Sequence, residues 1–281
     1  MSARLAIAGL AVAALFGAAQ AQAQSTLERM RDSGTVTVGF AGEQPYGWRA
    51  KSGEVTGEAP EIARVVLERL APGVEIDWVE VPFGQLIPGL TAGEFDLVAA
   101  GMFITPERCA QVAFSDPTYV IGEAFAVRAG NPEGIGSYVD ISTHDKARVG
   151  LISGTVEYNY ALVTGIPAGR APLYVNFDEA IDALKAGEVD AVGLTTLTVQ
   201  GLVENEPELE ATGQFYPRID GEEVRGYGGF AFRRDDDALR AAFNAELGGF
   251  LASEAHWALV EPFGFTPDMA PDRTAEDLCS G

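Results

Sequence analysis

The sequence predicts an α/β protein folded as two similar lobes that the chain links by two crossings. Short apolar stretches typical of strands alternate with stretches of helical periodicity. One strand–helix–strand segment recurs 94 residues further on, and the form Phe-Ala-x-Arg occurs at residues 125–128 and 230–233. The alternation is typical of α/β folds, and the repeat indicates that the same unit is built twice.

Composition and charge limit the functional classes. The chain has 281 residues, 47% of them hydrophobic, and a formal net charge of −22. Because nucleic acid and anionic membrane surfaces require basic patches, this charge argues against either as a partner. The length suits one large domain or two ordinary ones.

The first 23 residues have the form of a removable signal peptide. Arg4 precedes an apolar run over residues 5–19, and small residues offer cleavage sites near Ala21 or Ala23. The run is shorter than the roughly 20 apolar residues that a membrane-spanning helix needs, which favours cleavage over an uncleaved anchor. We therefore expect a free periplasmic protein, exported across a bacterial inner membrane.

The two cysteines, Cys109 and Cys279, are candidates for a disulfide. In an oxidising compartment this bond would tie the C-terminal tail to the segment around Arg108. Alternatively, Cys109 is a buried apolar residue, because sequence does not supply the Cα separation that a disulfide requires. The histidines, His144 and His256, lie far apart and no CxxC motif is present, so we expect no metal site and no cofactor.

The first lobe is expected to begin with alternating helices and strands. In chain order these are a helix over residues 26–33, a strand over 35–40, a loop over 41–57, a helix over 59–70, a strand over 76–81, a helix over 83–92 and a strand over 96–100. This strand stops at Gly101. The following Thr105-Pro106-Glu107-Arg108 has the form of a helix start, with Thr105 as N-cap and proline at the first helical position.

Arg108 is the first candidate ligand-binding residue. It lies near the C-terminal end of a strand, where open α/β sheets bind ligands. A guanidinium at this place can bind a carboxylate through two parallel hydrogen bonds. The alternative is an internal salt bridge, since structural arginines are common.

The internal repeat divides the chain. Nine residues recur in one ungapped register 94 positions later, namely Val81, Phe83, Ile87, Leu90, Ala92, Gly93, Glu94, Asp96 and Val98. If the two Phe-Ala-x-Arg segments are crossover strands lying side by side, lobe 1 comprises residues 25–126 and 232–281, and lobe 2 comprises residues 127–231. Alternatively, the second segment is the last strand of lobe 2.

The second lobe is expected to repeat this alternation. Its elements, and those that return to lobe 1, are a strand over residues 148–152, a helix to 163, a strand over 173–175, a helix to 186, a strand over 191–194, a helix over 196–205, strands over 214–216 and 227–232, helices over 235–253 and 256–260, and an extended tail from 267. Thr155, after Gly154, would cap the first helix and leave the amides of Val156 and Glu157 to face an anion. Thr195 occupies the position equivalent to Gly101 in the repeat.

Several motifs carry a family resemblance. They are Val38-Gly39-Phe40 with Pro45-Tyr46-Gly47, Gly93-Glu94-Phe95-Asp96, and Thr105-Pro106-Glu107-Arg108 with Phe114-Ser115-Asp116-Pro117. The combination resembles the polar-amino-acid type of periplasmic solute-binding protein (solute-binding protein family 3), over essentially the whole mature chain. The resemblance implies a monomer with a two-lobed, type II venus-flytrap fold that closes on its ligand by hinge bending. It also implies ABC importer permease subunits in the inner membrane as partners.

The resemblance assigns roles to two positions. In that family the arginine matching Arg108 binds the ligand's α-carboxylate, and an aspartate after the second-lobe strand binds its α-amine. Here the strand motif at residues 187–192 is intact, but the amine-binding position is Thr195. Because an ammonium buried without a carboxylate is costly, a simple α-amino acid becomes a poorer candidate.

Aromatic side chains suggest what replaces the amine site. Tyr46, Phe83 and Phe103 lie in segments expected to open onto the cleft from lobe 1, and Glu43 precedes Tyr46 by three residues. Ring faces attract diffuse cations by roughly 0.5–2 kcal/mol each. Taken singly, such a ring is more often a core residue than a ligand-binding one, but the joint placement of these rings with Arg108 and Glu43 describes a site for a compact zwitterion.

Within the family, the sequence looks closest to ectoine- and hydroxyectoine-binding proteins, through residues 83–90 and 99–109. Ectoine is a cyclic amidinium carboxylate, so the resemblance implies a binder of compatible solutes; a polar or basic amino acid or a betaine is the alternative. A further alternative is an enzyme resembling cyclohexadienyl dehydratases with Glu43 as the acid, although no nucleophile arrangement supports catalysis. The candidate ligand-binding residues are Glu43, Tyr46, Phe83, Gly101, Phe103, Thr105, Arg108, Gly154, Thr155, Val156 and Thr195.

Overall fold

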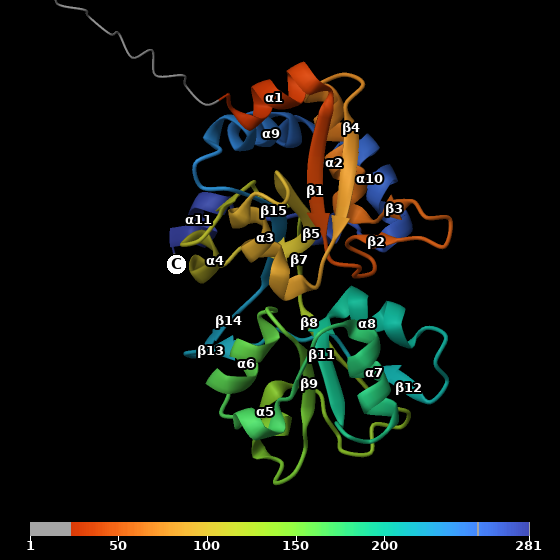
Figure 1. Ribbon diagram of the computed structural model, residues 1–281. Coiled ribbons are helices and arrows are strands. Elements are labelled where there is room, and N and C mark those ends of the chain that lie inside the picture. The colour runs from red at the N-terminus through yellow and green to blue at the C-terminus, as the bar shows by residue number, and fades with distance from the viewer. Residues whose placement is uncertain (1–23, 252, 281) are drawn as a thin grey trace, which may run out of the picture.

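Figure 1 shows a computed structural model of the protein, which describes residues 24–251 and 253–280. Two α/β lobes lie one above the other, each with its own sheet. The expected signal peptide, residues 1–23, lies outside the described residues. Within the described ranges no helix is both long and apolar enough to cross a membrane, and no three His, Cys, Asp or Glu side chains are grouped to hold a metal ion.

Lobe 1 contains a six-stranded sheet. Its strands lie in the order β4 (Glu75–Glu80), β1 (Thr35–Phe40), β5 (Leu97–Phe103), β15 (Gly226–Phe232) and β6 (Ala113–Phe114), and β7 (Tyr119–Ile121) also pairs with β15. β1 runs parallel to β4 and β5, whereas β15 is antiparallel to β5, β6 and β7. Ile62 and Val66, one turn apart on α2 (Glu58–Leu70), share one apolar core with Phe230 of β15.

Lobe 2 contains a five-stranded sheet with an equivalent order. Its strands lie in the order β10 (Leu173–Tyr174), β9 (Val149–Ile152), β11 (Ala191–Thr195), β8 (Glu123–Arg128) and β12 (Leu209–Ala211). β9 runs parallel to β10 and β11, and β8 is antiparallel to β11 and β12. Strand for strand, β10, β9, β11 and β8 therefore correspond to β4, β1, β5 and β15, which confirms that the unit is built twice.

The two Phe-Ala-x-Arg segments occupy equivalent strands and do not lie side by side as predicted. The first lies in β8 of lobe 2 and the second in β15 of lobe 1, so the alternative placement of the second in lobe 2 is also wrong. Arg128 forms an ion pair of 2.9 Å with Asp190, and Arg233 one of 3.2 Å with Asp96. The two aspartates are matching members of the 94-residue repeat, so the paired sequence motifs mark the same structural position in each lobe.

The chain crosses between the lobes twice. The first crossing is Gly122, between β7 and β8, and its carbonyl accepts hydrogen bonds from the amide and hydroxyl of Thr196. The second crossing is residues 224–225, between β14 (Glu222–Glu223) and β15. From sheet membership we propose residues 24–122 and 226–280 as lobe 1 and residues 123–225 as lobe 2.

The helices largely follow the predicted order. They are α1 (Thr26–Ser33), α2, α3 (Leu86–Ala92), α4 (Pro106–Cys109), α5 (Tyr138–Thr143), α6 (Glu157–Val163), α7 (Phe177–Lys185), α8 (Thr196–Val203), α9 (Asp237–Phe250), α10 (Glu254–Val260) and α11 (Ala275–Ser280). Short strands complete the fold, namely β2 (Trp48–Arg49), β3 (Val55–Thr56) and β13 (Arg218–Ile219), which pairs with β14. Sequence periodicity did not predict α5 or the β13–β14 hairpin.

Four local predictions differ from the structure. β5 does not end at residue 100 but continues through Gly101, because β15 pairs with its last residues. Helix α6 begins at Glu157 and is not capped by Thr155, whose hydroxyl instead donates to the Ile152 carbonyl and closes the preceding turn. The tail beyond residue 267 is not extended, since it folds into α11, with Leu278 buried. The strand expected over 214–216 is reduced to one bridge to β8.

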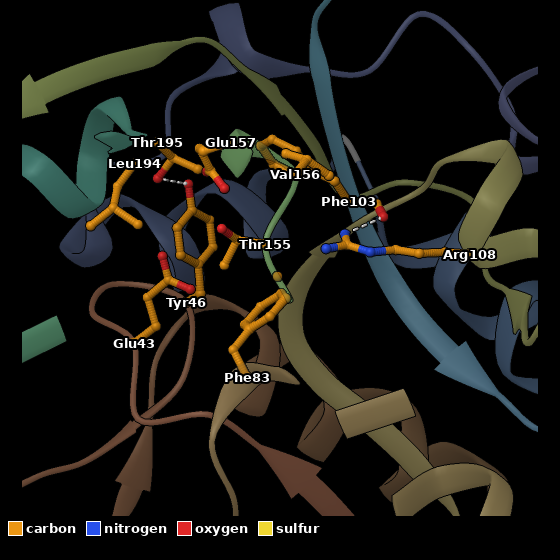
Figure 2. Close-up of a pocket in the computed structure, with 11 residues that line it drawn as sticks. Glu43, Tyr46, Phe83, Phe103, Arg108, Thr155, Val156, Glu157, Leu194 and Thr195 are labelled. Carbon is orange, nitrogen blue, oxygen red and sulfur yellow. Dashed lines mark hydrogen bonds between the residues drawn. The ribbon is translucent and has the colours of Figure 1, made fainter. Parts of the chain in front are cut away.

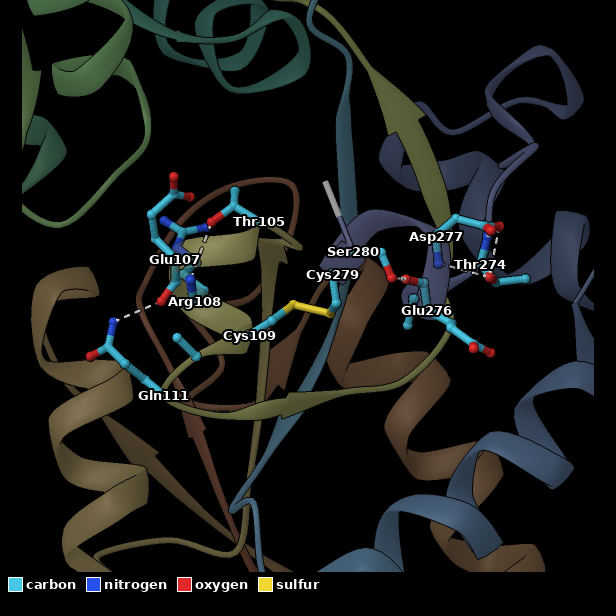
Figure 3. The surroundings of a disulfide bond; sticks show 12 residues. Thr105, Glu107, Arg108, Cys109, Gln111, Thr274, Glu276, Asp277, Cys279 and Ser280 are labelled. Atoms are coloured by element: carbon cyan, nitrogen blue, oxygen red, sulfur yellow. Dashed lines mark hydrogen bonds between the residues drawn. A yellow bond between two sulfur atoms is a disulfide. The ribbon is translucent and has the colours of Figure 1, made fainter.

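A disulfide joins Cys109, the last residue of α4, to Cys279 in α11, with a Cα–Cα distance of 5.6 Å (Figure 3). The sequence left this pairing open. At the start of α4, the hydroxyl of Thr105 accepts a hydrogen bond from the Arg108 amide, as the N-cap prediction required. Helix α4, which carries Arg108, is therefore fixed at both ends.

Candidate functional site

A small pocket lies between the two lobes, with an open cavity of about 20 Å³ in this structure (Figure 2). This cavity is little larger than the room that one water molecule needs, so the two lobes are closed tightly over the site. Its lining residues are Glu43, Tyr46, Phe83, Gly101, Phe103, Arg108, Thr155, Val156, Glu157, Leu194 and Thr195. Those up to residue 108 belong to lobe 1, and the rest belong to lobe 2.

Arg108 is the only cation among the residues that line this pocket. Arg108 is only 8% exposed, and burial lowers the pKa of its guanidinium. The side chain donates to the carbonyls of Phe103 at 2.8 Å and Gly154 at 3.0 Å, which leaves three of its five N–H donors without a bond to the described residues. None of the ion pairs within residues 24–251 and 253–280 includes Arg108, so the internal salt bridge considered as an alternative is not formed.

Aromatic rings form the lobe 1 wall of the pocket. Gly101 has φ of +61°, and a Cβ at this position would lie 2.4 Å from the Tyr46 ring, so only glycine allows the ring to pack there. Tyr119 supports the Tyr46 ring from behind, with ring centroids 5.2 Å apart. Phe83 holds its ring 5.4 Å from the Arg108 guanidinium carbon, a cation–π contact that helps to orient the arginine.

Three hydrogen bonds connect the lobes across the pocket. The hydroxyl of Tyr46 donates to Thr195 at 2.9 Å, and the hydroxyl of Thr198 donates to Glu43 at 2.7 Å. The third is the bond from Arg108 to the Gly154 carbonyl. The structure therefore represents a closed arrangement in which both lobes share the groups of one site.

Buried carboxylates surround the pocket. Burial raises the pKa of Glu43 to about 8, although the hydrogen bond from Thr198 opposes this rise. Burial likewise raises the pKa of Glu157, whose residue is 3% exposed. Behind the lining, burial and the neighbouring Glu157 hold the pKa of Glu123 well above its usual range, and burial raises that of Glu58 to about 8. Such a site favours a ligand that brings positive charge to these acids.

Nine of the eleven candidate residues line the pocket. Thr105 does not line the pocket, because its hydroxyl caps α4. Gly154 does not line it either, but its carbonyl accepts a hydrogen bond from Arg108. Thr155 and Val156 line the pocket as expected, even though neither side chain caps α6. Sequence reasoning missed the side chains of Glu157 and Leu194. Position offered the only signal for Leu194, which directly precedes Thr195.

Comparisons with known proteins agree on one family. A family model described as bacterial extracellular solute-binding proteins, family 3, matches residues 36–264. The chain is 35% identical over 280 residues to a probable amino-acid ABC transporter periplasmic-binding protein of Sinorhizobium fredii, with 98% of this chain and 93% of that protein covered.

Solved structures show the same likeness. A crystal structure of EhuB in complex with hydroxyectoine matches with a TM-score of 0.82 and 35% identity, covering 90% of this chain and 97% of that one. An ancestral arginine-binding protein bound to arginine matches with a TM-score of 0.72 and 29% identity, covering 82% of this chain and 98% of that one. Both comparisons extend across the two lobes and the pocket between them.

Proposed function

The chain belongs to the bacterial extracellular solute-binding proteins of family 3, and from this premise we propose that it captures a compact zwitterion and delivers it to an ABC importer. In this proposal the two lobes close over the solute outside the cytoplasm, and the closed form docks on the permease subunits. Support for the importer comes from the name of the Sinorhizobium fredii relative, which is 35% identical over nearly the whole chain.

Arg108 carries the proposal for the ligand's negative end. A guanidinium buried without a carboxylate partner is costly unless a ligand supplies one. Arg108 has this environment, and its free N–H donors lie at the pocket. A ligand carboxylate would accept charge-assisted hydrogen bonds from them.

The opposite side of the pocket suits a positive charge. Glu43 and the ring of Tyr46 line it, and Figure 2 shows both on the side away from Arg108. Ring faces and a carboxylate together stabilise a cation whose charge is spread over several atoms. The strand position that holds an amine-binding aspartate in the family is Thr195 here, and its hydroxyl is already bonded to Tyr46 and Thr198.

We therefore propose ectoine or hydroxyectoine as the preferred ligands. The amidinium of these molecules is a diffuse cation, and their single carboxylate matches Arg108. The likeness to EhuB in complex with hydroxyectoine supports this choice, and the likeness to the ancestral arginine-binding protein supports a basic amino acid as the alternative ligand.

Calorimetric titration of the mature protein tests the proposal. The panel is ectoine, hydroxyectoine, glycine betaine, arginine and glutamine. We expect ectoine or hydroxyectoine to bind at least about tenfold more tightly than the other three. If arginine or glutamine binds most tightly, ectoine is the wrong ligand, but the protein remains a solute-binding protein of an importer. A panel without any binding would contradict zwitterion capture.

One observation favours a second candidate function. The raised pKa of Glu43, about 8, means that this residue can hold a proton at neutral pH, as a general acid must. An enzyme resembling cyclohexadienyl dehydratases would use such an acid. Incubation with prephenate or arogenate separates the two functions, because a binding protein returns either compound unchanged.

A further inference from the structure

We propose that Glu157 is the lobe 2 half of the cation site, so that the ligand's cation must carry N–H groups that bind Glu43 and Glu157 from two sides. This inference rests on the proposed capture of a zwitterion and narrows its ligand class. It excludes quaternary ammonium compounds, which have no N–H group, and favours amidinium, guanidinium and protonated amines.

The Glu157 carboxylate is buried, faces the pocket and lacks a partner. Glu157 is the first residue of α6, and Figure 2 shows its carboxylate directed toward the space between Tyr46 and Thr155. Its Oε2 atom is fully buried and accepts no hydrogen bond from the described part of the chain. A buried acceptor without a partner costs about 1–3 kcal/mol, and more when it is charged. A ligand N–H group would remove this cost.

Glu123 explains why Glu157 can be the charged member of a buried acid pair. Glu123, 2% exposed, lies beside Glu157, and burial together with this neighbouring acid raises the pKa of Glu123. Thr155 and Arg108 also stabilise the Glu157 carboxylate. Because Arg108 favours the charged form of Glu157, the negative charge of the pair is favoured on Glu157, which can accept hydrogen bonds from the pocket.

The two carboxylates approach the pocket from different lobes. Glu43 lies in the loop between β1 and β2 of lobe 1, and its Oε1 already accepts the bond from Thr198. Glu157 belongs to lobe 2, and charge repulsion between the two contributes to the raised pKa of Glu43. An amidinium or guanidinium presents N–H groups on separate edges, so it can satisfy both acids and hold the lobes together.

Aromatic rings alone would not make this distinction. Cation–π attraction requires no N–H group, so Tyr46 and Phe103 would accept a quaternary ammonium as readily as an amidinium. The two acids change this preference, because a methylated cation would leave both carboxylates buried without hydrogen-bond partners. Discrimination against a ligand that lacks a required N–H group can be large for that reason.

Proline and proline betaine provide a matched pair of probes, since they share a ring and a carboxylate but differ in N–H groups. Calorimetry would measure both, with ectoine and arginine, on wild type, Glu157→Gln and the control Glu188→Gln. Glu188 is an exposed lobe 2 glutamate in the turn before β11. We expect wild type to bind its tightest N–H ligand at least about tenfold more strongly than proline betaine. Glu157→Gln should weaken that ligand about tenfold or more, with proline betaine and the control within about twofold of wild type.

The outcomes separate this inference from the proposed function. Wild-type binding of proline betaine as tight as that of the best N–H ligand overturns the inference without any variant. An equal loss for both ligand types in Glu157→Gln, or no loss, also overturns it. If wild type binds none of the four probes, zwitterion capture itself fails and the inference fails with it. Because the ligand comparison uses wild type, misfolding of a variant cannot mask the result.

Discussion

Replacement of Arg108 by alanine tests the centre of the proposed site. Arg108 is buried, donates to the Phe103 and Gly154 carbonyls, and has no ion-pair partner within the described residues. Removing one member of a buried ion pair costs about 3–5 kcal/mol. A bound carboxylate would lose that partner in Arg108→Ala, so we expect affinity for the best ligand to fall roughly 150- to 5,000-fold.

Two further variants sharpen this test. Arg108→Lys keeps the charge but loses the planar fork that reaches carbonyls and carboxylate together, so we expect a smaller loss, roughly ten- to a hundredfold. Arg218→Ala is the control, because Arg218 is an exposed arginine of the β13–β14 hairpin. Calorimetry on variants whose melting curves show a folded state gives the comparison. Affinity of Arg108→Ala within about threefold of wild type would refute carboxylate binding by this residue.

The remaining predictions concern stability and closure. The double variant Cys109→Ser/Cys279→Ser should lose about 2–5 kcal/mol of unfolding free energy. This corresponds to a decrease of roughly 4–20 °C in Tm. A Tm measured by calorimetry that differs from wild type by less than about 2 °C would contradict this prediction. Burial raises the pKa of Glu58 to about 8, so its contribution to the stability of the ligand-free protein is complete below its ordinary pKa and is lost as pH rises through 8. Wild-type Tm should thus fall between about pH 5 and 9, and an equally steep fall in Glu58→Gln would disprove the assignment. A Cβ at Gly84 would lie 3.0 Å from the Ser153 carbonyl oxygen of the other lobe. Gly84→Ala should therefore weaken closure by about 1–3 kcal/mol, seen as lower ligand affinity and a more open form in small-angle X-ray scattering, and unchanged affinity and shape would argue against this lobe contact.

Much of the fold could be predicted because local signals and tertiary context agreed. The cap at Thr105 and the amphipathic pattern of α2 each specify a helix on their own. The 94-residue repeat allowed the strand and helix order of lobe 2 to be predicted from that of lobe 1. Pairing between distant segments was not predictable in the same way, because Phe-Ala-x-Arg is compatible with several sheet positions. The arginine of each motif forms an ion pair with an aspartate from a distant segment of the same lobe, and the sequence alone does not show this contact.

Within the site, the sequence located the lobe 1 wall better than the lobe 2 wall. The lobe 1 residues lie in the last part of a strand, just after a strand, or in a capped helix, where position limits the direction of a side chain. Glu157 was missed because its amide, not its carboxylate, was the group considered at the start of α6. Only the three-dimensional packing shows that α6 begins at Glu157 and turns this acid inward, with Glu123 of β8 behind it.

The two crossings give the lobes unequal chain connectivity. Residues 123–225 form one uninterrupted stretch that contains the whole of the smaller sheet, whereas the larger sheet is assembled from segments on either side of it. Lobe 2 can therefore be exchanged as a cassette between relatives by splicing at Gly122 and residue 225, with the Arg108 helix and its disulfide left untouched. Such chimeras would exchange Glu157 and Thr195 together, and their binding would show which lobe determines ligand specificity.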